Sequence, residues 1–194
     1  MRPPESATRT NQLWDEQRPD WMCGCCRRTK PALWRRGKDG RLVGALHQHH
    51  DHLMDYPNAL LRIHLGPDWT AILEQKHPGA DHFRSGLCRF VERFPAEIIC
   101  QDCNVAEGAA KRHVQGDRFF SFAPPEIARI ITPMSSATHQ VNREIAARIW
   151  RMETRFLARR KQFVERSIER LLAGDFWSAG YSFASWHYQY GIPP

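Results

Sequence analysis

The sequence of 194 residues lacks several features that define whole classes of protein. It has no run of about 18 apolar residues, the length that a membrane-spanning helix needs, so we expect no membrane span. Its first 20 residues contain no apolar segment of the kind found in a secretory signal peptide. It also has no internal repeat and no low-complexity tract. These absences favour a cytoplasmic protein, in which cysteines are more often metal ligands or free thiols than disulfides.

The composition favours a folded protein with a basic surface. Hydrophobic residues make up 42% of the chain and include seven Trp and ten Phe, which is enough for a core. The 28 Lys and Arg exceed the 21 Asp and Glu by seven. A balance this basic favours a polyanionic partner, most commonly nucleic acid, although a basic surface without a partner is the alternative.

Turn signals and apolar spacing in the first half predict short strands and helices. The KDG turn at 38–40 predicts a β-hairpin whose second strand is roughly Arg41–His49. Helical spacing predicts helices over 67–77 and 81–94. Residues 96–114 are expected to begin as a strand, turn at the cysteines and continue as a helix from Asn104.

The second half is predicted to be mainly helical. We expect a short helix over 125–131 and a long one over 137–174, ended by Gly174. The apolar stripe of the long helix is expected to pack on the rest of the protein and would also allow a homodimer through the 137–172 helix. This stripe contains Val141, Ile145, Ile149, Met152 and Phe156, followed after a polar break at 159–161 by Phe163, Val164, Ile168, Leu171 and Leu172. We expect the aromatic tail that follows to dock on the protein.

Two C-x2-C pairs are the clearest chemical signal in the sequence. Cys23 and Cys26 form one pair and Cys100 and Cys103 the other, and two such pairs suit a tetrahedral four-thiolate zinc site. Cys25 is too close to Cys23 to share that metal, and Cys88 is expected to be a core thiol. A redox or incidental cysteine cluster is the alternative interpretation.

Between the two pairs lies the run HQHHDH at 47–52, and Asn104 directly follows the second pair. Together with the flanking cysteines, this arrangement resembles the HNH, or His-Me finger, endonucleases, and among them the phage and bacterial HNH nucleases and the phage junction-resolving endonucleases. The resemblance covers roughly residues 21–115. It implies a metal-dependent DNA endonuclease with a ββα-metal core.

The resemblance assigns roles residue by residue. Asp51 and Asn104 match the ligands of a catalytic Mg²⁺ or Mn²⁺, and His52 matches the general base that activates water for phosphodiester hydrolysis. His49 matches an additional histidine beside the metal, and Glu107 an acidic residue found in some members. The four paired cysteines would hold a structural Zn²⁺. The gap between His52 and Cys100 is longer than usual in the family, and LMDYPNALL replaces the common glycine-containing turn.

The expected fold class is therefore α+β, with a small zinc-stabilised ββα-metal core, an inserted helical segment and a long C-terminal helix. We expect residues 1–20 to be an arm with an exposed Trp14, 21–115 to be the nuclease domain with an insertion at 53–97, and 116–194 to be a helical extension.

DNA is the expected partner of the basic surface. The candidate contacts are Arg27, Arg28, Lys30, Arg35, Arg36, Lys111 and Arg112. The chief alternative function is a non-catalytic, zinc-stabilised module that binds nucleic acid. A thiol-redox protein is a third interpretation, but no thioredoxin-like pattern surrounds the first cysteine pair.

Overall fold

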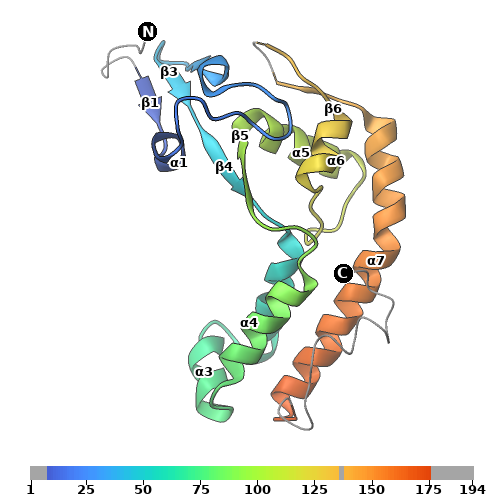
Figure 1. Ribbon diagram of the computed structural model, residues 1–194. Helices are drawn as coiled ribbons and strands as arrows, with labels where there is room; N and C mark the ends of the chain where they lie inside the picture. The colour runs from blue at the N-terminus through green and yellow to red at the C-terminus, as the bar shows by residue number, and fades with distance from the viewer. Residues whose placement is uncertain (1–7, 136–137, 176–194) are drawn as a thin grey trace. The chain divides into compact units, whose positions relative to one another are not determined.

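The computed structural model describes residues 8–135 and 138–175. It is a mixed α+β structure with small sheets and one long helix near its C-terminal end (Figure 1). The chain divides into two units, each built from discontinuous segments. Unit 1 contains Met1–His50, Phe94–Gly116 and Ser121–Ile149, and unit 2 contains Asp51–Arg93, Asp117–Phe120 and Trp150–Pro194.

The N-terminal part of unit 1 forms a three-stranded sheet. Strand β3 (Leu42–Gly44) pairs in parallel with β1 (Thr8–Thr10) and antiparallel with β2 (Arg35–Arg36). The β2–β3 pair confirms the hairpin predicted around the KDG turn. The predicted second strand is divided between β3 and β4 (Leu46–His49), which belong to different sheets.

Trp14 packs in unit 1, and the expectation that it is exposed is wrong. It lies in helix α1 (Gln12–Glu16), is 4% exposed, and stacks at a tilt on Trp34 with ring centroids 4.7 Å apart. Asn11 caps this helix and also exchanges two hydrogen bonds with the backbone of Leu46 in β4. Gly44 leaves room for the indole, because a Cβ there would lie 2.7 Å from the Trp14 ring. Helix α1 therefore contributes to the unit 1 core through Trp14.

A second pair of strands leads directly into a helix. Strand β4 pairs antiparallel with β5 (Glu97–Cys100), with Leu46 opposite Cys100 and His49 opposite Glu97. Helix α5 (Gln101–His113) follows β5 without a loop and contacts both strands (Figure 1). The prediction that this helix begins at Asn104 is wrong, because Cys100 is already its N-cap residue.

The rest of unit 1 covers α5. Helix α6 (Pro124–Ile130) contacts α5 and leads into a two-stranded sheet of β6 (Ile131–Thr132) and β7 (Gln140–Val141). The unit also contains a short 3-10 helix, η2 (Lys30–Leu33). Its fully buried side chains include Leu46, Ile99, Phe122, Ile127 and Ile130.

Unit 2 is helical. The 3-10 helix η3 (His52–Asp55) runs into α2 (Tyr56–Leu65), which is followed by α3 (Trp69–Lys76) and α4 (Ala80–Val91). The helices α2, α3 and α4 contact one another around a core that includes Leu53, Leu61, Leu73 and Leu87. The α3 and α4 predictions are confirmed, and α2 is an additional helix.

Helix α7 (Arg143–Leu172) is the predicted long helix, and it begins six residues later than expected. Val141 lies in β7 instead, and Asn142 accepts a hydrogen bond from the Ile145 backbone at the start of the helix. Gly174 has a φ of 78°, which confirms its predicted role after the helix C-terminus. The tail from residue 176 lies outside the described residues.

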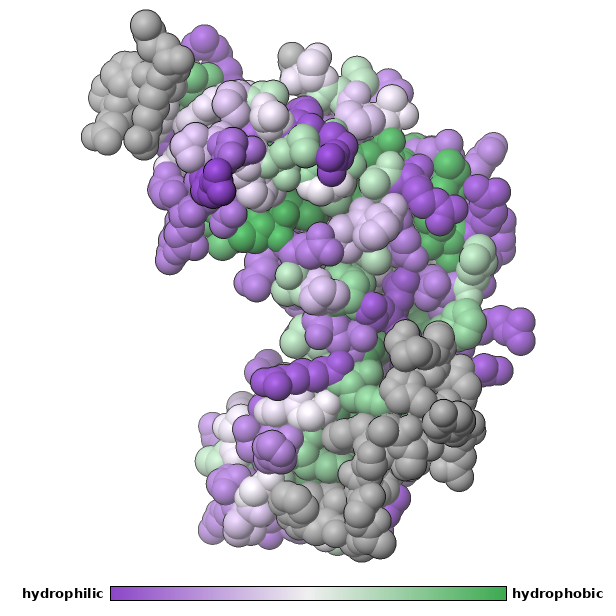
Figure 2. Space-filling model, in the orientation of Figure 1, coloured by the Kyte–Doolittle hydropathy of each residue, from purple (hydrophilic) through white to green (hydrophobic). Residues whose placement is uncertain are grey.

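The buried stripe of α7 differs from the predicted one in its first half. Met152 and Phe156 are 62% and 37% exposed, whereas Leu157 and Arg160 are buried. On the face shown in Figure 2, hydrophilic residues cover much of the described surface, with smaller hydrophobic areas between them. None of the helices in the described part of the chain has the length and apolar character to cross a membrane.

Candidate functional site

The first cysteine pair lies on a tight loop of unit 1. Backbone hydrogen bonds from Cys23 to the carbonyl of Arg28 (3.0 Å) and from Arg27 to the carbonyl of Cys23 (2.9 Å) close the loop. Arg27 has a left-handed φ of 60°, which is costly for a residue other than glycine. The surrounding contacts therefore hold this loop in one shape, with Cys23 and Cys26 both buried.

The second pair lies where β5 becomes α5. Cys100 is the last residue of the strand, and Cys103 lies in the first turn of the helix. Residues three apart share one face of a helical turn, so the two sulfurs point the same way. The backbone N–H of Cys100 donates a hydrogen bond to Cys23 Sγ at 3.4 Å, which links the two pairs.

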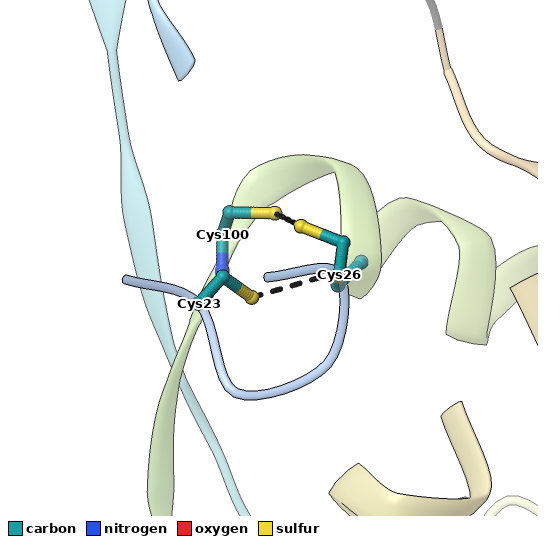
Figure 3. A group of neighbouring side chains, drawn as sticks. Cys23, Cys26 and Cys100 are labelled. Atoms are coloured by element: carbon teal, nitrogen blue, oxygen red, sulfur yellow. Dashed lines mark hydrogen bonds between the residues drawn. The ribbon is translucent and has the colours of Figure 1, made fainter. Parts of the chain in front are cut away.

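The four sulfurs form one cluster with the dimensions of a metal site. Cys26 Sγ lies 3.7 Å from Cys100 Sγ (Figure 3), Cys23 Sγ lies 3.7 Å from Cys103 Sγ, and all four sulfurs lie within 4.8 Å of one another. A tetrahedral zinc with Zn–S bonds of about 2.3 Å places its sulfurs about 3.8 Å apart, whereas a disulfide requires about 2.05 Å. The residues therefore fit a closed four-thiolate zinc site and are not disulfide-bonded.

Two of the four paired cysteines favour the thiolate form. The pKa values of Cys23 and Cys26 are lowered, whereas those of Cys100 and Cys103 are raised. Hydrogen bonds from Cys100 and Cys103 lower the pKa of Cys26 to about 4. Zinc binds thiolate rather than thiol, so a preformed thiolate reduces the number of protons that metal binding must displace. Cys25 is buried beside the cluster but is not among the four sulfurs that could hold a metal ion, and Cys88 is buried in α4.

Three residues that the sequence did not assign to the site surround the sulfurs. Arg28 Nη2 lies 3.8 Å from Cys100 Sγ and 3.3 Å from His139 Nε2, and it forms an ion pair with buried Asp102. His139 Nδ1 accepts a hydrogen bond from the Met134 N–H at 3.2 Å, and His139 helps to lower the pKa of Cys26. These donors offset the negative charge of the thiolates. The position of Asp102, a charged residue between two paired cysteines, could have identified it from the sequence, whereas His139 lies 37 residues further along the chain.

Asp51 and His52 lie at the start of unit 2 and face different environments. Asp51 is fully buried, and its carboxylate accepts hydrogen bonds from the backbone N–H groups of Leu53 (3.2 Å) and Arg93 (2.8 Å). Burial raises the pKa of this carboxyl, and the two hydrogen bonds oppose that shift. The side chain of His52 is 46% exposed. The turn into η3 therefore directs Asp51 inward and His52 to the surface.

His52 opens into a cleft on unit 2. The cleft has a volume of about 640 Å³. Its lining residues are His52, Asp55, Asn58, Ala59, Arg62, Ile63, Arg118 and Phe119. Asp55 Oδ2 lies 4.0 Å from His52 Nδ1, close enough for an electrostatic interaction. An imidazole with a carboxylate behind it and arginines beside it is suited to proton transfer next to an anionic group.

Asn104, His49 and Glu107 belong to unit 1. Asn104 is half-buried in the first turn of α5, and its side-chain amide forms no hydrogen bond to another described residue. His49 Nε2 donates to the carbonyl of Phe122 at 2.7 Å, and Glu107 Oε1 accepts from the Phe122 N–H at 3.2 Å. Both side chains are buried, and burial raises the pKa of Glu107. His49 thus binds the carbonyl of Phe122, and Glu107 binds its N–H group.

The predicted nucleic-acid contacts differ in their surroundings. Arg28 and Arg35 both form ion pairs with Asp102, and Lys30 donates to the carbonyl of Gln17 at 2.7 Å. Arg27 and Arg36 are exposed on unit 1. Lys111 and Arg112 lie in the last turn of α5, where positive charge also stabilises the helix C-terminus.

No family model matches the chain, and neither the curated proteins nor the solved structures include a significant match to it.

Proposed function

We propose that the protein is a metal-dependent DNA endonuclease of the HNH type, stabilised by a zinc ion on its four paired cysteines. The observation that carries the proposal is the order of elements around the sulfur cluster. A strand that ends just before Asp51 and His52 pairs with a second strand, and the second strand runs directly into a helix that begins at the metal site and presents Asn104. This is the strand–strand–helix order that the resemblance implies.

The donor types suit the proposed catalytic metal. Asp51 and Asn104 offer a carboxylate and an amide oxygen, which are the hard ligands that Mg²⁺ and Mn²⁺ prefer. A carboxylate has about four lone-pair sites, and the two backbone hydrogen bonds of Asp51 occupy two of them. When bound, the metal would neutralise charge on the phosphate and on the leaving oxygen.

The protein's own residues supply the proton transfer. His52 is exposed in the cleft and accepts a proton from the attacking water as general base. Asp55, on the Nδ1 side of the ring, favours the imidazolium that this transfer creates. Zinc on the four thiolates has no open position for water and therefore contributes to folding rather than to hydrolysis.

A non-catalytic zinc-stabilised module that binds nucleic acid is the second candidate. The burial of Asp51 favours it, because a fully buried carboxylate bonded to two backbone N–H groups already has a structural role. In that case the basic surface binds nucleic acid and nothing hydrolyses it.

The two candidates are separated by a plasmid-cleavage assay on zinc-loaded protein. The nuclease proposal expects nicking or linearisation with Mg²⁺ or Mn²⁺ and none with EDTA. His52→Ala should reduce the rate by about 100-fold or more, the typical contribution of a general base. His64→Ala is the matched control, because His64 is also exposed on unit 2 but does not line the cleft.

Equal cleavage by His52→Ala and the wild type would reject the assigned base. If the zinc-loaded wild type binds DNA but leaves it intact with either metal, the non-catalytic module is the correct interpretation.

A further inference from the structure

The cleft beside His52 contains more positive charge than proton transfer alone requires. Arg62, near the end of α2, is exposed and forms no ion pair with another described residue. Arg118, from a different lining segment, is also exposed. With Asp55 as the only acidic residue among the lining residues, the two arginines leave the cleft with a net positive charge. Such a cleft attracts an anionic ligand.

A hydrogen-bonded turn and an aromatic ring lie beside Arg118. Asp117 accepts hydrogen bonds from the Phe119 backbone (2.8 Å, through Oδ1) and from Lys161 (2.8 Å, through Oδ2). The guanidinium carbon of Arg118 lies 4.4 Å from the centroid of the Phe119 ring. An arginine held by its neighbours loses little freedom on binding, so it binds phosphate at a low entropic cost.

The cleft also exposes an apolar side chain. Ile63 is 70% exposed, the highest value among the large hydrophobic residues exposed in the described chain. It lies next to Arg62 in sequence and lines the same cleft. Asn58 adds an amide whose Oδ1 accepts a hydrogen bond from Arg84 at 2.9 Å and whose NH₂ group is a donor. Cationic, apolar and amide groups within about 640 Å³ match the phosphate, the base face and the base edge of a nucleotide.

We propose that this cleft binds one unpaired nucleotide of a nucleic-acid strand, with Arg62 and Arg118 on its phosphate and Ile63 against its base. The base must be unpaired, because bases within a duplex cover one another's faces and cannot present one to Ile63. The substrate class is therefore single-stranded nucleic acid or a branched structure with unpaired nucleotides. Cleavage of the bound strand by His52 rests on the proposed function, whereas binding does not.

The test is fluorescence anisotropy with a short labelled oligodeoxythymidine on zinc-loaded protein, with the catalytic divalent metal omitted. Arg62→Ala and Arg118→Ala should each weaken binding roughly tenfold, the loss expected for one charge-assisted hydrogen bond. The logarithm of the association constant falls linearly with the logarithm of the salt concentration, and the magnitude of this slope should decrease by about 0.7 for each lost phosphate contact. Ile63→Ser should weaken binding of the oligonucleotide and leave the salt slope unchanged.

Arg89→Ala is the matched control, because Arg89 is an exposed arginine of unit 2 that does not line the cleft. A weakening by Arg89→Ala equal to that of the cleft variants would overturn the proposal, because it would show binding by overall charge. Binding of a blunt duplex as tight as that of the single strand would overturn it too. Arg62→Lys, which keeps the charge, checks that any loss does not come from misfolding, and thermal unfolding of each variant provides a second check.

The outcomes also separate this inference from the proposed function. Binding that depends on Arg62 and Arg118, without cleavage under Mg²⁺ or Mn²⁺, supports the cleft and rejects the nuclease. Cleavage that depends on His52 but not on either arginine supports the nuclease and rejects the cleft as the nucleotide site.

Discussion

Asp51 allows the structural and catalytic contributions of one residue to be separated. Its carboxylate is fully buried and accepts two backbone hydrogen bonds, from Leu53 at 3.2 Å and from Arg93 at 2.8 Å. Asp51→Ala removes both acceptors and leaves two N–H groups without a partner. Asp51→Asn keeps one acceptor and places an NH₂ group against the other donor.

The expected loss follows from these contacts. Each buried N–H left without a partner costs about 1–3 kcal/mol, which gives about 2–6 kcal/mol for Asp51→Ala. Burial of the Asp51 carboxylate is itself unfavourable, and it raises the pKa of the group. The substitution removes this buried charge and so offsets part of the loss, and we expect a net decrease of about 2–4 kcal/mol in the free energy of unfolding. For Asp51→Asn we expect about 1–2 kcal/mol for the same reasons.

Urea denaturation at pH 7, followed by circular dichroism, measures these differences. Asp55→Asn is the control, because this exposed carboxylate lies in η3, the 3-10 helix that Asp51 caps, and its loss should cost less than about 0.5 kcal/mol. If Asp51→Ala changes the free energy of unfolding by no more than Asp55→Asn, the two hydrogen bonds are not part of the folded protein. Cleavage assays on Asp51→Asn well below its melting temperature then report the catalytic contribution separately.

Three further predictions concern unit 1. Asp102→Asn should destabilise the protein by about 3–5 kcal/mol in urea denaturation, because it removes the carboxylate that pairs with buried Arg28 and leaves only the cysteine sulfurs beside that guanidinium; a loss below about 1 kcal/mol would contradict the buried pair. Gly44→Ala should lower the free energy of unfolding by about 1–3 kcal/mol, because its Cβ would overlap the Trp14 ring, and an unchanged value would show that Trp14 does not pack there. Burial raises the pKa of Glu107, so the folded state holds that proton more tightly than the unfolded state and the free energy of unfolding should fall as pH rises above about 4.3. Glu107→Gln should flatten this part of the pH profile, and an unaltered slope would exclude Glu107 as its source.

The sequence predicted features that depend on spacing or on turn residues. The two C-x2-C pairs identified the four clustered sulfurs, because a tetrahedral metal requires four ligands and no other pairing of the six cysteines has that spacing. The KDG turn and Gly174 were also predicted, because their backbone geometry depends on the residues at those positions.

Features that depend on packing with distant segments were not predicted. Trp14 is surrounded by polar residues in sequence, and its burial depends on Gly44 and Trp34, which come 20 to 30 residues later. The predicted apolar stripe of α7 was partly wrong because Arg160 is buried. The carboxylates of Asp51 and Glu153 favour the charged form of this arginine. Hydropathy treats such an arginine as a break in the stripe, although its aliphatic stem packs like an apolar side chain. His139 lies beside the cluster because of the tertiary fold, and no spacing in the sequence indicates this position.

The four-sulfur site is the claim on which the rest of the account depends. X-ray absorption at the zinc edge, on protein purified without added chelator, measures it directly. We expect one tightly bound zinc per chain with four sulfur neighbours at about 2.3 Å, and the loss of this signal in Cys103→Ser. A chain without bound metal in which these cysteines form disulfides, or a zinc coordinated mainly by nitrogen or oxygen, would contradict it.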